Sequence, residues 1–283
     1  MAFSPPHTTL EAYIDIPFNI WLSIILIIAY GCAIRNRGLL LLIVLGCSTT
    51  IVAFDKTSTV GEMTKTMCLL PLGLGSVLAF LVASRSFQTR FLSAFTTYVN
   101  FAVYGNIGMM VATPADGTLR GMCSKVACAA LFIWIVQQGR RAGWRTIFLH
   151  DDLFVFTSVS KSWIFAHAIY RFVLLTLPCF GSGRRHRLLE VYSLTLTFAL
   201  SSTSNLPFEY CFGMADTLVV PAVAGWSAIA TTFNLIPRDA MKTPNNIGTS
   251  ADACLGAMSL AVAMFACYKI ASAPRRGSRV VNR

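Results

Sequence analysis

Nine long apolar stretches divide this chain and constrain its fold more than any other feature. Each comes close to the roughly 20 residues that a helix needs to cross the hydrocarbon core of a bilayer. Only 12% of the residues are charged, whereas soluble domains carry about 25%, so a soluble fold could not cover its surface. The stretches lie at 16–34, 38–54, 67–84, 91–113, 122–138, 162–180, 188–206, 211–235 and 251–272.

The sequence therefore predicts an all-α fold, a polytopic transmembrane helical bundle of about eight to ten spans. The only long polar connectors, 55–66 and 237–250, leave no room for a soluble domain. We expect one integral membrane domain over residues 1–283, with a basic tail at 274–283. Its surroundings would be the lipids of a plasma membrane or an inner membrane.

The net charge of +11 comes from basic residues that cluster in short connectors between the apolar stretches. Cytoplasmic loops collect Lys and Arg, so we expect the clusters at 35–37, 85–90 and 140–145 to be cytoplasmic. The chain carries no zinc-finger or helix-turn-helix signature, which argues against a nucleic-acid partner.

The rule that basic loops face the cytoplasm cannot be satisfied everywhere in the second half of the chain. If residues 146–187 contain one span, the GRRHR connector at 183–187 falls outside. If they contain two spans, that connector lies inside and the basic tail falls outside. The sequence leaves both arrangements open.

A weak internal similarity appears when the chain is shifted by 105 residues. NFAVYGNIGM at 100–109 then aligns with NLPFEYCFGM at 205–214, with identical residues at three positions. Parallel duplications are common in secondary transporters. The shift suggests two parallel four-helix repeats, at 16–113 and 121–218, although apolar sequences also match by chance.

Three basic residues, Lys161, His167 and Arg171, lie in the apolar stretch VSKSWIFAHAIYRFVLLTLPCF at 159–180. His167 and Arg171 are four residues apart and share a helix face, with Lys161 on its flank. Charged side chains within a membrane almost always face a bundle interior or a cavity. The three form the side of a cavity that faces an anion, or else Lys161 extends to the membrane surface while Arg171 meets a neighbouring carboxylate or carbonyl.

Arg171 cannot lose its proton, so at membrane depth it needs an anionic or strongly accepting partner. The nearest acids in the C-terminal half are Glu190, Glu209 and Asp216. We expect Glu209 to share a polar cavity with Arg171, because it follows Pro207 at a point where a helix should break.

That second locus is SSTSNLPFEYCFGMAD at 201–216, the densest polar cluster in the apolar part of the chain. Pro207 removes a backbone donor just after Asn205, which predicts a discontinuous helix whose freed groups meet a solute. Glu209 and Asp216 are seven residues apart and share a face if the helix resumes. The alternative is a short turn between two spans, with Glu209 among the headgroups.

Asn100 and Tyr104 complete the predicted solute-binding residues. They lie in NFAVYGNIGMMVATP at 100–114, where small residues at four-residue spacing also favour close helix packing. Either role is compatible with the pattern.

The search for an enzyme is mostly negative, because the chain contains no HExxH, GxSxG or Walker motif and only 4 His. A weaker apolar stretch at 146–160 is interrupted by His150, Asp151 and Asp152, which resemble an interfacial cluster more than a metal site. We expect no metal or other cofactor. The leading hypothesis is a transporter of a small anionic or zwitterionic solute. The alternatives are a membrane enzyme acting on a lipid or prenyl phosphate at His150–Asp152, and an accessory subunit of a membrane complex.

Overall fold

Five helices dominate the computed structural model over the residues that it describes. Each one coincides with an apolar stretch expected to be helical, so the helical class is confirmed for this part of the chain. The described residues are 24, 28, 85–112, 115, 117–144, 147–150, 153–156, 159–177, 189–203, 205–209, 211–213, 215 and 247–273. The helices are α4 (Arg85–Ala112), α5 (Leu119–Arg141), α6 (Lys161–Leu174), α8 (Leu189–Thr203) and α10 (Thr249–Ser272).

Two of these helices, α5 and α10, are long and apolar enough to cross a membrane. Several sequence predictions lie outside the described residues, among them the stretches 38–54 and 67–84 and the connector 55–66. The 105-residue repeat is not confirmed. Its best-matching segments differ in conformation, because 100–109 is continuous α4 whereas Asn205–Pro207 is not helical.

The stretch at 146–160 does not form a helix. It contains an antiparallel pair of strands, β1 (Ile147–His150) and β2 (Leu153–Phe156), with His150 opposite Leu153. Both runs are rich in Phe, Val and Ile, which favour strands, and only two residues connect them, as in a tight hairpin. Asp151 and Asp152 lie outside the described residues, and so do the side chains of both strands.

A second correction concerns 85–90, which was expected to be a loop. These residues form the first turns of α4 instead. At the other extreme, α6 contains only 14 residues and is about 21 Å long at 1.5 Å per residue. It is therefore shorter than the roughly 30 Å of a bilayer's hydrocarbon core, and the helix expected at 162–180 ends at Leu174.

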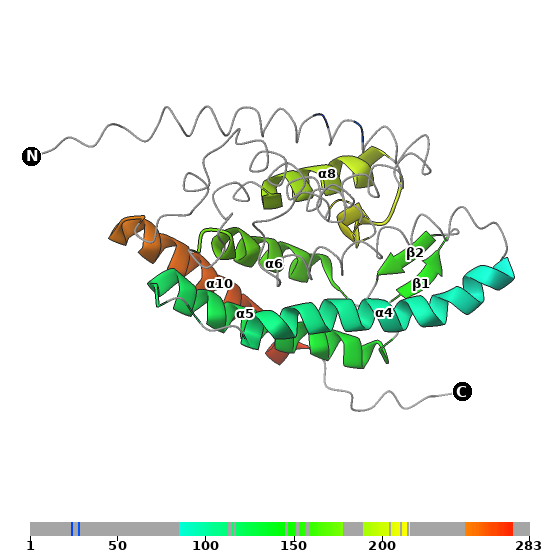
Figure 1. Ribbon diagram of the computed structural model, residues 1–283, viewed down its shortest axis with the longest axis horizontal. Helices are drawn as coiled ribbons and strands as arrows, with labels where there is room; N and C mark the ends of the chain where they lie inside the picture. Colours follow the sequence, from blue (N-terminus) through cyan, green and yellow to red (C-terminus); the bar gives the residue numbers. More distant parts are fainter. Residues whose placement is uncertain are drawn as a thin grey trace, which may run out of the picture.

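The two candidate spans, α5 and α10, run in the same direction. At their starts, Arg120 Nη1 of α5 lies 2.6 Å from Asp252 Oδ1 of α10, and further along Ser124 Oγ lies 3.0 Å from Ser259 Oγ. Near their ends, Gln137 Nε2 donates to the carbonyl of Ile270 at 3.3 Å. Figure 1 shows the two helices side by side. Any membrane that both helices cross is therefore crossed with the same orientation.

Helix α6 runs opposite to α5. At the start of α6, the backbone N–H of Ser160 donates to Gln138 Oε1 at 2.9 Å. Beyond its end, the Thr176 carbonyl accepts from Arg120 at 3.2 Å. We call the end of the bundle with Arg120, Thr176 and Asp252 the Asp252 end, and the end with Gln138, Trp144 and Lys161 the Trp144 end.

Helix α8 runs opposite to α6, because three contacts between them follow in reversed order. Phe208, beyond the end of α8, has its ring 5.5 Å from Nζ of Lys161, the first residue of α6. In the middle, the rings of Phe165 and Phe198 lie 5.7 Å apart. Towards the Asp252 end, Arg171 of α6 forms an ion pair with Glu190 of α8. Helix α6 thus lies between α8 on one side and α5 with α10 on the other (Figure 1).

The apolar core lies where α5, α6 and α10 meet, and it includes Leu131, Ile135, Ile164 and Ala266. The outward face of α10 stays exposed although it is apolar, with Met264 67% and Tyr268 64% accessible. Such a large exposed apolar face is rare on soluble monomers and fits contact with lipid or with another protein.

Candidate functional site

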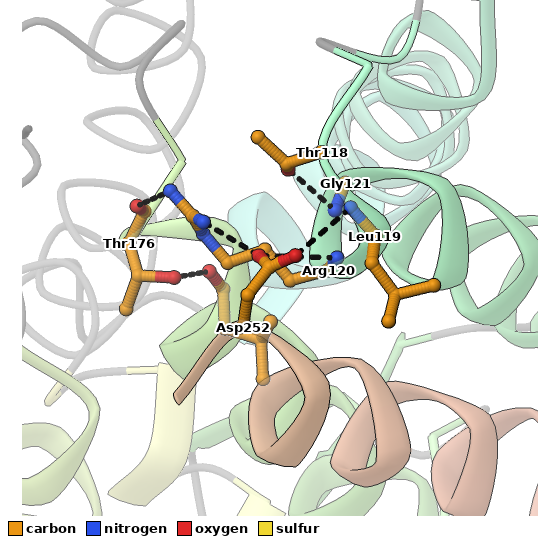
Figure 2. A network of polar contacts seen from close by, with 7 residues as sticks. Thr118, Leu119, Arg120, Gly121, Thr176 and Asp252 are labelled. Carbon is orange, nitrogen blue, oxygen red and sulfur yellow. Dashed lines mark hydrogen bonds and ion pairs between the residues drawn. The ribbon is translucent and has the colours of Figure 1, made fainter. Parts of the chain in front are cut away.

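The Asp252 end holds a partly buried ion pair that joins three helices, with the side chain of Asp252 22% exposed (Figure 2). The side chain of Arg120 is 1% exposed, and its Nη1 lies 2.6 Å from Asp252 Oδ1. Its Nη2 donates to the carbonyl of Thr176, just after α6, at 3.2 Å. Arg120 therefore ties α5 to both α10 and the end of α6.

Asp252 also caps the start of α5. Its Oδ2 accepts from the backbone N–H of Leu119 at 3.1 Å, and its Oδ1 accepts from that of Arg120 at 3.4 Å. Thr118 completes the cap by accepting from the N–H of Gly121 at 3.0 Å. A carboxylate at a helix N-terminus satisfies unpaired backbone donors and interacts favourably with the helix dipole. Both charges of this pair are thus occupied by structural contacts.

Sequence reasoning missed this pair, because its residues are 132 positions apart in the chain. One signal was available. Arg120 lies at the positive end of the α5 dipole, where a cation is unfavourable unless an acidic side chain lies beside it.

A second buried ion pair joins α6 to α8. Arg171 contacts Glu190, and each side chain is only 3% exposed. The expectation that Arg171 needs an anionic partner is therefore confirmed, but the partner is Glu190 rather than Glu209. Antiparallel packing explains the difference. Glu209 follows Phe208 beside Lys161, and Lys161 is ten residues from Arg171 along α6, about 15 Å away.

Arg171 lies deeper in the bundle than Arg120. Arg120 contacts the carbonyl of Thr176, and Arg171 precedes Thr176 by five residues, about 8 Å along the helix axis. Arg171 is in the last turn of α6 and Glu190 in the first turn of α8, so the pair is fully buried but lies towards the Asp252 end of the bundle.

Glu190 begins a buried polar face on α8. Ser193 and Thr197 follow at helical spacing, and both are fully buried. Thr197 Oγ1 donates to the carbonyl of Ser193 at 2.7 Å. Among the described side chains, Ser193 Oγ is buried without a hydrogen-bond partner. Because an unsatisfied buried hydroxyl costs about 1–3 kcal/mol, this group favours a ligand or water beside it.

The predicted helix break in 201–216 is confirmed. Helix α8 ends at Thr203, and Asn205–Pro207 is not helical, with Asn205 at φ 53°. Asn205 is exposed and Glu209 is half-buried. Lys161 lies beside this break, through its contact with Phe208. Asp216, the last acid predicted here, lies outside the described residues.

His167 is half-buried and stacks on Trp163 of the same helix, with ring centroids 4.6 Å apart. Trp163 in turn donates to the carbonyl of Leu131 on α5 at 3.1 Å. His167 is thus part of the aromatic packing beside α5, one turn from Arg171.

Asn100 and Tyr104 lie at the Trp144 end. Asn100 donates to the carbonyl of Trp144 at 3.2 Å, and the Tyr104 ring meets the Trp144 ring edge-on at 5.5 Å. The hydroxyl of Tyr104 comes so close to Gly139 that a Cβ there would clash. These contacts favour the packing role for both residues.

The eight predicted residues therefore do not form one cluster. Among the described residues, no group of three or more His, Cys, Asp or Glu is placed to hold a metal ion. Arg171 with Glu190 and Ser193 is the arrangement best suited to bind a small polar molecule. No protein-family model, curated protein or solved structure matches this chain.

Proposed function

We propose that this protein is a multi-pass membrane carrier for a small anionic or zwitterionic solute, located in a plasma or inner membrane. The observation that carries the proposal is the buried polar set of Arg171, Glu190 and Ser193 in a bundle whose core is mostly apolar. Charged groups at membrane depth are costly and usually mark solute or ion pathways. Replacing a buried ion pair by apolar residues is often neutral or stabilising, so stability alone does not explain it.

Helix directions support a specific topology for this carrier. Since α5 and α10 are parallel, the end of α10 at Ser272 lies on the same side as Arg140 and Arg141. Helix α6 runs opposite to α5, and α8 runs opposite to α6. The chain therefore crosses the bundle once between α5 and α8, so residues 146–187 contain one span rather than two. The GRRHR connector at 183–187 then faces the opposite side. Eight to ten spans remain part of the proposal, whereas the four-helix repeat does not, because the hairpin at 147–156 takes the place of one of its helices.

One observation favours an accessory subunit as a second candidate. Ala253, Ala257 and Ala261 are exposed at four-residue spacing on α10. Small residues at this spacing let two membrane helices approach closely. The enzyme hypothesis depends on the side chains of His150, Asp151 and Asp152, which lie outside the described residues.

Solute binding by Ser193 provides a test that leaves the fold intact. We would reconstitute the full chain in liposomes and measure uptake of sulfate, gluconate and L-glutamate, with binding measured by thermal shift in detergent. We expect at least one of these anions to bind and enter. Ser193→Ala should weaken its binding about two- to tenfold, because a hydrogen bond contributes about 0.5–1.5 kcal/mol, without lowering the melting temperature.

Thr197→Val is the matched control, because the Thr197 hydroxyl is already used by the Ser193 carbonyl. It should leave anion affinity unchanged. If none of the three anions bound or entered, the carrier proposal would be wrong, and the subunit role would become the better account.

A further inference from the structure

The buried pair on α6 and α8 has the properties of a site where an anion and a proton bind together. We infer that an anionic solute replaces Glu190 on Arg171 when Glu190 takes up a proton, so that the carrier moves one proton with each anion. This inference depends on the proposed function and identifies its binding site and its coupling. The solute group is a carboxylate, sulfate or other oxyanion that fits the planar guanidinium.

Arg171 keeps its charge under all conditions in which the protein is folded. Its side chain is 3% exposed, and the carboxylate that neutralises it, Glu190, is equally buried. Removing Glu190 from the guanidinium without a substitute would leave a buried, uncompensated charge, which is strongly unfavourable. An entering anion removes that penalty by taking the place of the carboxylate.

Once displaced from Arg171, Glu190 also meets the cost of a buried, uncompensated charge. As a displaced carboxylate it would be a second buried charge, whereas as a neutral acid it costs much less to bury. A proton from water adds to one carboxylate oxygen, and no covalent bond of the solute changes. For a monoanion such as gluconate, the charge at the site is the same before and after, because the solute replaces the carboxylate charge on Arg171.

Ser193 supplies the remaining polar contact. It lies three residues after Glu190, on the same face of α8, and its buried hydroxyl has no hydrogen-bond partner among the described residues. In the exchanged state this hydroxyl can donate to the bound anion or accept from the protonated acid. This role explains why the Ser193 hydroxyl is buried at a position where it makes no hydrogen bond to the described residues.

The other charged groups around the pair do not account for such coupling. On α6, His167 lies one turn before Arg171 and stacks on Trp163. From α5 and α10, Arg120 and Asp252 approach the end of α6 but neutralise each other at 2.6 Å. On the described part of α8, Glu190 is the acid that faces Arg171.

The test measures how anion affinity depends on pH. With sulfate, gluconate and L-glutamate as probes, the dissociation constant of the purified chain is measured between about pH 6 and 8. Coupling to one proton predicts that affinity falls by up to about tenfold per pH unit over the range in which the bound state carries one proton more than the free state. Glu190→Gln should bind the same anion with little pH dependence, because the amide resembles the neutral acid. His167→Gln is the control and should keep the slope of the wild type.

A second measurement needs no variant. Adding the anion to wild-type protein in weakly buffered detergent solution should cause uptake of about one proton per anion bound. If an anion binds but neither slope nor proton uptake appears, the coupling is wrong while the carrier proposal stands. A slope that persists in Glu190→Gln would also overturn it. If no probe binds, the carrier proposal fails and the coupling fails with it.

Discussion

Replacing Asp252 with alanine is expected to lower the free energy of unfolding by about 3 kcal/mol, because the buried guanidinium of Arg120 loses its carboxylate. This is the low end of the cost of breaking a buried ion pair, since the side chain of Asp252 is 22% exposed. Arg120 would remain 1% exposed with no carboxylate against its guanidinium. The backbone N–H groups of Leu119 and Arg120 would lose their acceptor at the same time. The measurement is unfolding in mixed micelles with increasing SDS, followed by the loss of helical signal.

Two further variants separate the charge from the other contacts. Asp252→Asn keeps an acceptor for the N-terminus of α5 but loses the charge, so it should be destabilised by an intermediate amount. Ser250→Ala alters an exposed residue in the same turn and should change stability by less than about 0.5 kcal/mol. Equal stability of Asp252→Ala and Ser250→Ala would mean that the Arg120–Asp252 ion pair contributes nothing to the free energy of unfolding.

The second large effect concerns Arg171 and Glu190, whose single substitutions should differ in cost. Glu190→Leu leaves a buried arginine that cannot be neutralised and should cost about 3–5 kcal/mol. Arg171→Leu leaves a carboxyl group that can take up a proton, so its cost should be smaller. Arg171→Leu combined with Glu190→Leu should recover most of the stability and abolish anion uptake.

The matched control for this cycle is Glu209→Leu. Because Glu209 lies at the Trp144 end, adding this change to Arg171→Leu should give no recovery, and the two costs should add. Recovery by Glu209→Leu rather than by Glu190→Leu would contradict the antiparallel arrangement of α6 and α8.

The approximate positions of the five described helices could be predicted, because each coincides with a long apolar stretch, but α6 is shorter than its stretch. The break after Thr203 was also predictable, since Pro207 cannot donate a backbone hydrogen bond and restricts the residue before it. The hairpin at 147–156 was not predictable in the same way. A short apolar run without a clear period fits a strand and a buried helix equally well.

The partners of the buried charges depended on information that the chain order does not contain. Glu190 and Glu209 both follow Arg171 in the chain, one at the start of α8 and the other beyond its end. Only the direction of α8 decides which of the two carboxylates contacts Arg171. The Arg120–Asp252 pair similarly requires α5 and α10 to be parallel, and the number of spans between them was left open by the charges of the loops. The direction in which each helix runs was therefore the information that the sequence lacked for predicting the ion pairs.

The parallel arrangement of α5 and α10 within a membrane is the central claim, and cysteine labelling tests it most directly. In a background with all nine native cysteines replaced, single cysteines are placed at four exposed positions: Gly117, Gly143, Ser250 and Ser272. They are treated with a membrane-impermeant maleimide in sealed, oriented vesicles. We predict that Gly117→Cys and Ser250→Cys react from one side, and Gly143→Cys and Ser272→Cys from the other. Reaction of Gly117→Cys and Ser250→Cys from opposite sides would contradict the account.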